Sequence, residues 1–200
     1  MKTSAAIIGL LAFAAITPAS AAPVVGETTP AFSETTIDGV SLTNDMLDDQ
    51  LYILEWTNHE CPFVQKHYNA GNMQKTQQKA AEADAVWITV ISSAPGKQGH
   101  VSADEARELT TSRGAQPDHI ILDEDGSMGR LFDAKTTPHM YISDRTDTLR
   151  YAGAIDSIRS ASVDDIPQAE NYVLSAVTSI SAGQEVATKQ TRPYGCAVKY

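Results

Sequence analysis

The chain has 200 residues, and its 25 acidic residues outnumber its 15 Lys and Arg residues, giving a formal net charge of −10 at pH 7. This acidic balance argues against nucleic acids and anionic membrane surfaces as partners, because both repel negative charge. No glycine-rich phosphate loop follows a predicted strand, and nothing in the sequence identifies a nucleotide, flavin or haem site, so we predict no cofactor.

Residues 1–21 have the pattern of a secretory signal peptide. Lys2 supplies a positive start, residues 5–16 are apolar, and Ala19-Ser20-Ala21 fits the small-x-small cleavage rule. The apolar run is short for a membrane span, although an uncleaved anchor is the alternative. We therefore expect an exported protein, periplasmic or secreted, with no membrane contact after cleavage. The remaining 179 residues (200 minus 21) are enough for one domain, which we place at 22–183, with a tail over 184–200.

The chain then alternates strand and helix patterns, which predicts an α/β fold. In chain order, the patterns predict a hairpin over 32–42, a helical turn over 44–49, a strand over 51–56, a helix from Pro62 broken near Gly71 and resumed over 73–83, a strand over 86–91, a loop over 92–101, a helix from the Ser102–Glu105 capping box to Gly114, a short strand over 120–122, a hairpin of strands 139–142 and 149–153, and an amphipathic helix spanning Ile166 to Ile180.

The stretch with the clearest chemistry is the turn that ends at Cys61. It follows the apolar strand 51–56, and Pro62 suits the first position of a helix. Cys61 therefore lies at the helix N-terminus, where free backbone N–H groups and the helix dipole lower the pKa of a thiol. A thiolate is the nucleophilic form of cysteine, so Cys61 is the candidate nucleophile.

These features resemble the thioredoxin-like superfamily, and within it the redoxin branch that includes peroxiredoxins. The resemblance covers roughly residues 24–182 and depends on the strand–Cys-Pro–helix unit, on Thr137-Pro138 ahead of a strand, 77 residues after Cys61 (138 minus 61), and on the β/α alternation. It implies a central mixed sheet flanked by helices, with an N-terminal hairpin and a C-terminal tail. It also implies that Pro138 is cis and lies against Cys61, with Thr137 presenting its backbone to a bound disulfide.

The sequence departs from the patterns of two subfamilies. Thioredoxins carry Cys-x-x-Cys, but Val64 stands three residues after Cys61. Peroxiredoxins carry Pro-x-x-x-Thr-x-x-Cys, but Leu54 and Asn58 stand at the Pro position and three residues before the cysteine. The particular reaction therefore stays open between attack on a disulfide and attack on a peroxide.

Either reaction needs a second thiol, and within this sequence only Cys196, in the tail, can supply one. Cys196 could resolve the intermediate if the tail docks close to Cys61, or an external thiol reductant could do so. Two aromatic residues in the tail favour docking. Partners would then be a thiol or disulfide protein, or a small peroxide.

Two further residues are weaker candidates. His59, in the turn before Cys61, could stabilise the thiolate or move a proton, and a surface turn histidine is the alternative. Glu55, in the apolar strand, could be a buried proton relay, as the resemblance suggests, or could face outward.

Two other function classes remain open. Cys61 and Cys196 could form a structural disulfide in a domain without catalysis, which would stabilise the fold by on the order of 5 kcal/mol in the loop-entropy treatment. Alternatively, copper or zinc could bind to Cys61, His59, His67, His100 and His139. Exported thioredoxin-like proteins include copper chaperones, although this sequence lacks their second local cysteine. We predict no resident metal.

Overall fold

The computed structural model describes residues 22–200, so the predicted signal peptide lies outside the described residues. The helices and strands are β1 (Ser33–Thr35), β2 (Ser41–Thr43), η1 (Asn44–Leu47), β3 (Leu51–Trp56), α1 (Pro62–Asn69), α2 (Asn72–Ala81), β4 (Ala85–Ile91), α3 (Ala103–Arg113), β5 (His119–Leu122), α4 (Ser127–Leu131), β6 (Thr136–Thr137), β7 (His139–Ser143), β8 (Leu149–Gly153), η2 (Val163–Gln168), α5 (Tyr172–Ser181) and β9 (Cys196–Ala197).

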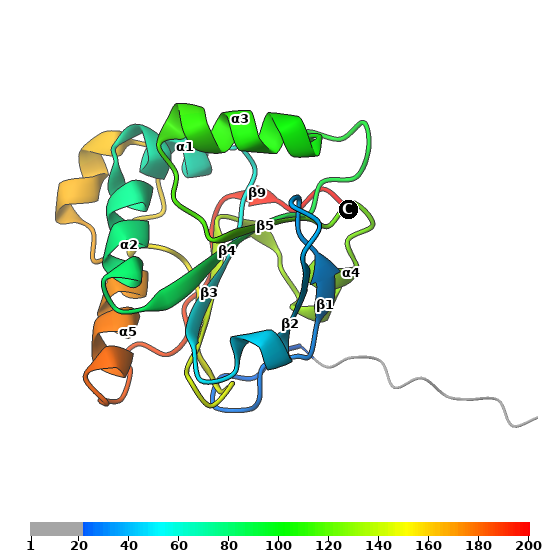
Figure 1. Cartoon of the computed structure of the whole chain (residues 1–200). Helices are drawn as coiled ribbons and strands as arrows, with labels where there is room; N and C mark the ends of the chain where they lie inside the picture. Colours follow the sequence, from blue (N-terminus) through cyan, green and yellow to red (C-terminus); the bar gives the residue numbers. More distant parts are fainter. Residues whose placement is uncertain (1–21) are drawn as a thin grey trace, which may run out of the picture.

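The centre of the fold is a five-stranded mixed sheet in the order β5-β4-β3-β7-β8. Strands β3, β4 and β5 run parallel, whereas β7 pairs antiparallel with β3 and β8. Figure 1 shows α1, α2 and α5 on one side of this sheet and the β1–β2 hairpin with α4 on the other. The central mixed sheet flanked by helices is confirmed, and so is the N-terminal hairpin.

All six residues of β3 are buried, because helices or the hairpin cover both faces of the sheet. Side chains alternate between the faces, so Leu51 and Ile53 pack in the core under α1, α2 and α5. Tyr52 and Leu54 pack in the core on the other side. By the same alternation Glu55 belongs to the face that carries the helices.

The helix that follows Cys61 breaks where the sequence predicts. Gly71 has a φ of 68°, a left-handed conformation that glycine adopts without strain, and it separates α1 from α2. The capping box of α3 is also present, since the Ser102 side chain accepts from the backbone of Glu105 while Glu105 reaches back to the Ser102 N–H. Local sequence signals therefore determine where α1 gives way to α2 and where α3 begins.

The last helix begins later than its apolar spacing predicts. Ile166 and Ala169 are not part of α5, because a 3₁₀ helix that contains Pro167 precedes it. Asn171 caps α5 by accepting a hydrogen bond from the backbone N–H of Leu174. Pro167 disfavours a regular helix at the residue before it, and the Asn171 cap defines the new start.

The tail docks on the domain along its length. Its strand β9 pairs antiparallel with β6, with Thr136 opposite Ala197 and Thr137 opposite Cys196. Before β9, Gln190 forms a bridge with Ala152, and after β9, Lys199 forms a bridge with Ser93. The residues from 184 onward are therefore an integral part of the folded domain.

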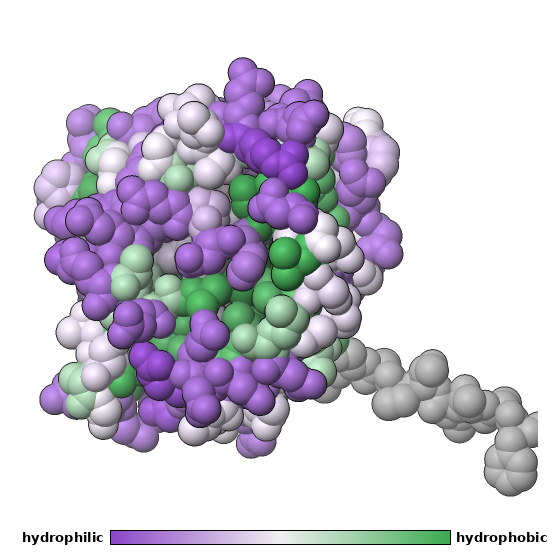
Figure 2. Space-filling view, viewed as in Figure 1, coloured by the Kyte–Doolittle hydropathy of each residue, from purple (hydrophilic) through white to green (hydrophobic). Residues whose placement is uncertain are grey.

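Hydrophilic side chains cover most of the face shown in Figure 2, and apolar side chains gather in its middle, below α3. Within residues 22–200, no helix has the length and apolar character needed to cross a membrane.

Candidate active site

Cys61 is the N-cap residue of α1, with Pro62 at the first helical position as the sequence predicts. Its side chain is fully buried, and its Sγ donates a hydrogen bond to the backbone oxygen of Thr137 at 3.1 Å. The Thr137–Pro138 peptide bond is cis. The turn before the helix and the segment before β7, far apart in sequence, thus meet at one sulfur atom.

The pairing of β6 with β9 brings the second cysteine to the same place. Cys196 lies opposite Thr137 in the ladder, and it packs at the edge of the core cluster that contains Cys61. Gly195 makes this approach possible, because a Cβ atom at that position would lie 1.9 Å from the oxygen of Thr137. Both cysteines are free thiols in this structure.

The surroundings give the two thiols opposite acidities. Burial by itself would raise the pKa of Cys61, but hydrogen bonding from Cys196, through its thiol and its backbone N–H, together with the Val64 N–H and Thr137, lowers the pKa below its ordinary value. Burial and the adjacent Cys61 raise the pKa of Cys196 to about 11. Cys61 is therefore the thiol that ionises first.

Thr137 contributes more than its carbonyl to this site. Its hydroxyl is buried and, within the part of the chain that the structure describes, has no other hydrogen-bond partner. The hydroxyl is one of the groups that lower the pKa of Cys61. A donor held without a competing partner can respond to the charge that develops when the thiol ionises.

Glu55 is buried and faces inward. Its carboxylate accepts hydrogen bonds from Tyr68 Oη at 3.0 Å and from Trp87 Nε1 at 3.0 Å. Burial raises the pKa of Glu55, and these hydrogen bonds oppose that rise only in part. The outward-facing alternative is therefore wrong, and Glu55 is a buried titratable group on the sheet face that carries α1.

The residues His59 and Glu60 contact groups other than the Cys61 thiol. His59 lines a small pocket with Arg113 and Leu109, and burial together with the charge of Arg113 lowers the pKa of its imidazole. Glu60 accepts a hydrogen bond from the backbone N–H of Gly99 at 2.7 Å. Among residues 22–200, no hydrogen bond joins the His59 ring to Cys61, so its role at the thiolate stays a prediction.

A buried polar cluster beside the site was not found from the sequence. Lys66 forms an ion pair with Asp156 at 2.9 Å and donates to the backbone oxygen of Ile158 at 3.0 Å. Tyr194, from the tail, donates to the same carboxylate, and His67 lies 3.9 Å from it. The cluster joins α1 to the tail two residues before Cys196. Its only sequence signals are a Lys-His pair inside a predicted helix and a tyrosine two residues before a cysteine.

The described residues offer no ready-made metal centre. In the range 22–200, no group of three or more His, Cys, Asp and Glu side chains is arranged to hold a metal ion. His67 belongs to the Asp156 cluster, and His100 lies 3.0 Å from Glu124. The copper alternative therefore gains no support from the geometry.

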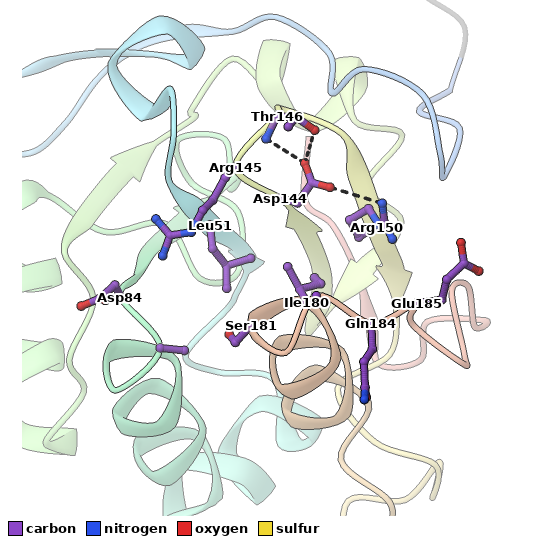
Figure 3. Close-up of a pocket in the computed structure, with 12 residues that line it drawn as sticks. Leu51, Asp84, Asp144, Arg145, Thr146, Arg150, Ile180, Ser181, Gln184 and Glu185 are labelled. Atoms are coloured by element: carbon purple, nitrogen blue, oxygen red, sulfur yellow. Dashed lines mark hydrogen bonds and ion pairs between the residues drawn. The ribbon is translucent and has the colours of Figure 1, made fainter.

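A separate pocket of about 780 Å³ lies away from the cysteines (Figure 3). It includes Leu51 at the start of β3, whereas Cys61 follows the other end of that strand. In this pocket Asp144 accepts hydrogen bonds from Thr146 and Arg150. These pairs hold the β7–β8 turn, and the pocket contains no thiol.

Comparison with solved structures identifies the fold. No protein-family model and no curated protein matches the chain. An uncharacterised conserved protein from Geobacillus kaustophilus superposes with a TM-score of 0.73 at 21% identity, over 88% of this chain and 92% of that one. A hypothetical protein from Sinorhizobium meliloti superposes with a TM-score of 0.70 at 19% identity, over 90% and 97%.

A third solved structure that matches is a thioredoxin domain. The thioredoxin domain of a thiol-disulfide oxidoreductase from Bacteroides vulgatus superposes with a TM-score of 0.52 at 11% identity, over 74% of this chain and 98% of that one. The chain thus has a thioredoxin-like fold, which is the fold that the resemblance of its motifs implies.

Proposed function

We propose that this chain is an exported thiol-dependent redox protein of the redoxin branch, which cycles between a dithiol and a Cys61–Cys196 disulfide. The observation that carries the proposal is the β6–β9 register, which sets Cys196 beside the thiolate-forming Cys61. A structural pair needs proximity alone. Here proximity is combined with a lowered pKa at a helix N-terminus, which is the arrangement of a reactive cysteine.

The reduced form reacts through the Cys61 thiolate. Attack on a peroxide breaks the O–O bond, releases water or an alcohol after protonation, and leaves a sulfenic acid on Cys61. Attack on a disulfide instead forms a mixed disulfide and releases one thiolate. In either case the Cys196 sulfur attacks Cys61, forms the internal disulfide and expels water or the second thiolate.

Supporting roles follow from the contacts. Thr137 accepts from the Cys61 thiol and contributes to its acidity, and Pro138 is joined directly to that carbonyl and completes this side of the site. Glu55 holds a proton at a pH where an exposed carboxyl has lost it, and so could supply one behind the site. His59 is proposed to move protons at the open side of the turn.

A non-reducing peptide map of the processed protein tests the cycle. One sample is mildly reduced, and a second is reduced and then given one equivalent of hydrogen peroxide. We expect the disulfide to open under mild reductant and peroxide to restore the Cys61–Cys196 peptide pair. If peroxide oxidises Cys61 without pairing, the resolving thiol lies in another molecule.

The structural-disulfide alternative has one observation in its favour, since Cys61 is fully buried. Buried disulfides resist reduction because the attacking thiolate cannot reach a sulfur atom. A Cys61–Cys196 disulfide that opens only in denaturant would establish this alternative and remove the catalytic cycle.

A further inference from the structure

The two cysteines differ in access as well as in acidity. Cys61 is fully buried, whereas Cys196 is partly exposed. An incoming thiolate must approach one sulfur of a disulfide along the S–S axis and expel the other. Of the two residues only Cys196 has exposed surface, so an attacking thiolate approaches from its side, and the sulfur with the lower pKa, the better leaving group, is that of Cys61. Both factors select the same direction of attack.

A cationic groove opens beside this cysteine. Its volume is about 810 Å³, and Gly195, the residue before Cys196, forms part of its wall. Lys135, Arg159 and Arg192 line it, all three exposed, and no carboxylate is among its lining residues. On a chain with a net charge of −10, such a groove is a local reversal of sign.

Two of the three cations are available to a ligand. Lys135 pairs with Asp133 at 3.0 Å, but across residues 22–200 neither Arg159 nor Arg192 forms an ion pair. Arginine binds carboxylates through two parallel hydrogen bonds, so a free pair of guanidinium groups favours an anion with more than one oxygen.

We propose that the reductant of the oxidised protein is a thiol that carries carboxylate groups, held in this groove by Arg159 and Arg192 and attacking the sulfur of Cys196. This inference depends on the proposed cycle, because it requires the Cys61–Cys196 disulfide.

The step balances as an ordinary exchange. The anionic thiol, as its thiolate, forms a bond to Cys196 Sγ while the Cys61–Cys196 bond breaks, and Cys61 leaves as a thiolate stabilised at the N-terminus of α1. A second molecule of the thiol then attacks the reductant's own sulfur in the mixed disulfide. Cys196 is released and takes up a proton, and the two reductant molecules leave as their disulfide.

Reduction rates with three small thiols test the charge selection on the oxidised full-length protein. The probes are mercaptosuccinate, which is anionic, 2-mercaptoethanol, which is neutral, and cysteamine, which is cationic, with each rate divided by the thiolate fraction present. We expect mercaptosuccinate to react about tenfold faster than the neutral thiol at low ionic strength, because the positively charged groove attracts an anion. The advantage should disappear in 1 M salt, where the Debye length is about 3 Å.

Charge reversal in the groove supplies the control. The double variant Arg159→Glu and Arg192→Glu should remove the advantage of mercaptosuccinate and leave the neutral thiol unchanged. A matched double variant, Lys75→Glu and Lys79→Glu on α2, makes the same change in net charge at exposed positions outside the groove. If both double variants behave alike, only the overall charge matters and the groove proposal is wrong.

Acid quenching of the reaction with mercaptosuccinate, followed by peptide mapping, locates the attacked sulfur. We expect the mixed disulfide on Cys196. A mixed disulfide on Cys61 would overturn the inference while leaving the two-cysteine cycle intact. A protein in which no Cys61–Cys196 disulfide forms would instead fail the proposed function, so the two failures are distinguishable.

Discussion

Cys61 and Cys196 are the same kind of residue placed in two different kinds of structure. Cys61 begins a helix inside the core, where backbone N–H groups converge on its sulfur, while Cys196 lies on a two-residue strand at the surface. Burial disfavours the thiolate at both positions, yet only Cys61 has enough donors to overcome it. The acidity of Cys61 therefore depends on its hydrogen-bond donors, and its distance from Cys196 depends on how the tail docks. The two properties can be changed separately.

The largest expected effect comes from breaking the cluster that joins the two regions. Lys66→Met leaves the buried Asp156 carboxylate without its counter-charge and should lower the free energy of unfolding by about 3–5 kcal/mol. Denaturation in urea measures it. Lys79→Met is the matched control, because the exposed Lys79–Glu82 pair should contribute less than about 1 kcal/mol. Equal losses in the two variants would mean that the buried cluster does not hold the tail.

The next variant moves the tail and leaves α1 in place. Gly195→Ala puts a Cβ atom against the oxygen of Thr137, so the β6–β9 pairing must shift. We expect disulfide formation after oxidant addition to slow by about 100-fold, the size of effect that a displacement of about 1 Å has on reacting groups.

Gly183→Ala controls for backbone strain in that experiment. Gly183 also has a positive φ, of 66°, but no atom lies within 4 Å of the point where its Cβ atom would stand. The control should therefore retain fast disulfide formation, monitored by loss of free thiols. A slow Gly183→Ala variant would show that strain alone explains the result for Gly195.

Single-cysteine variants separate the acidities. In Cys61→Ala, the pKa of Cys196 should fall from about 11 toward its ordinary value, because the neighbouring thiolate is gone. In Cys196→Ala, the pKa of Cys61 should rise, because one of its donors is lost. Thiolate absorbance near 240 nm as a function of pH measures both. Shifts in the same direction would contradict the coupling.

The smallest effect concerns the second titratable group on the Cys61 side of the sheet. Burial raises the pKa of Glu55 in the folded state, so the protein loses stability as pH rises from the ordinary glutamate value toward the raised one. Glu55→Gln lacks this loss while keeping an acceptor for Tyr68 and Trp87. Its stability relative to the parent should therefore increase with pH, by at most about 1.4 kcal/mol per pH unit for one proton. A difference independent of pH between 4 and 7 would show that Glu55 is not proton-linked.

Much of the fold could be predicted because its signals are local. The buried strand 51–56, the break at Gly71 and the Ser102 capping box each depend on residues within one or two turns of each other. The start of α5 could not be read from apolar spacing alone, because the cap at Asn171 decides it.

The site was predictable only in part for the same reason. Cys61 and Pro138 belong to motifs, but a two-residue strand such as β9 has no periodicity, so its partner cannot be inferred from sequence. Lys66 and Asp156 are 90 residues apart and meet only when the sheet has formed. Tail docking was expected from Tyr194, Cys196 and Tyr200, while the register that places Cys196 required the structure.

The β6–β9 ladder also links folding to redox chemistry through a closed thermodynamic cycle. The ladder holds the two sulfurs together while both are reduced. Folding has therefore already removed the conformational entropy that is lost when a loop of 135 residues (196 minus 61) closes. Whatever free energy a Cys61–Cys196 disulfide adds to the fold, the fold must add to the disulfide. Each Gly195 or Lys66 variant that loosens the tail should therefore make the reduced protein a weaker reductant as well as a less stable protein, because the fold then contributes less free energy to closing the Cys61–Cys196 bond.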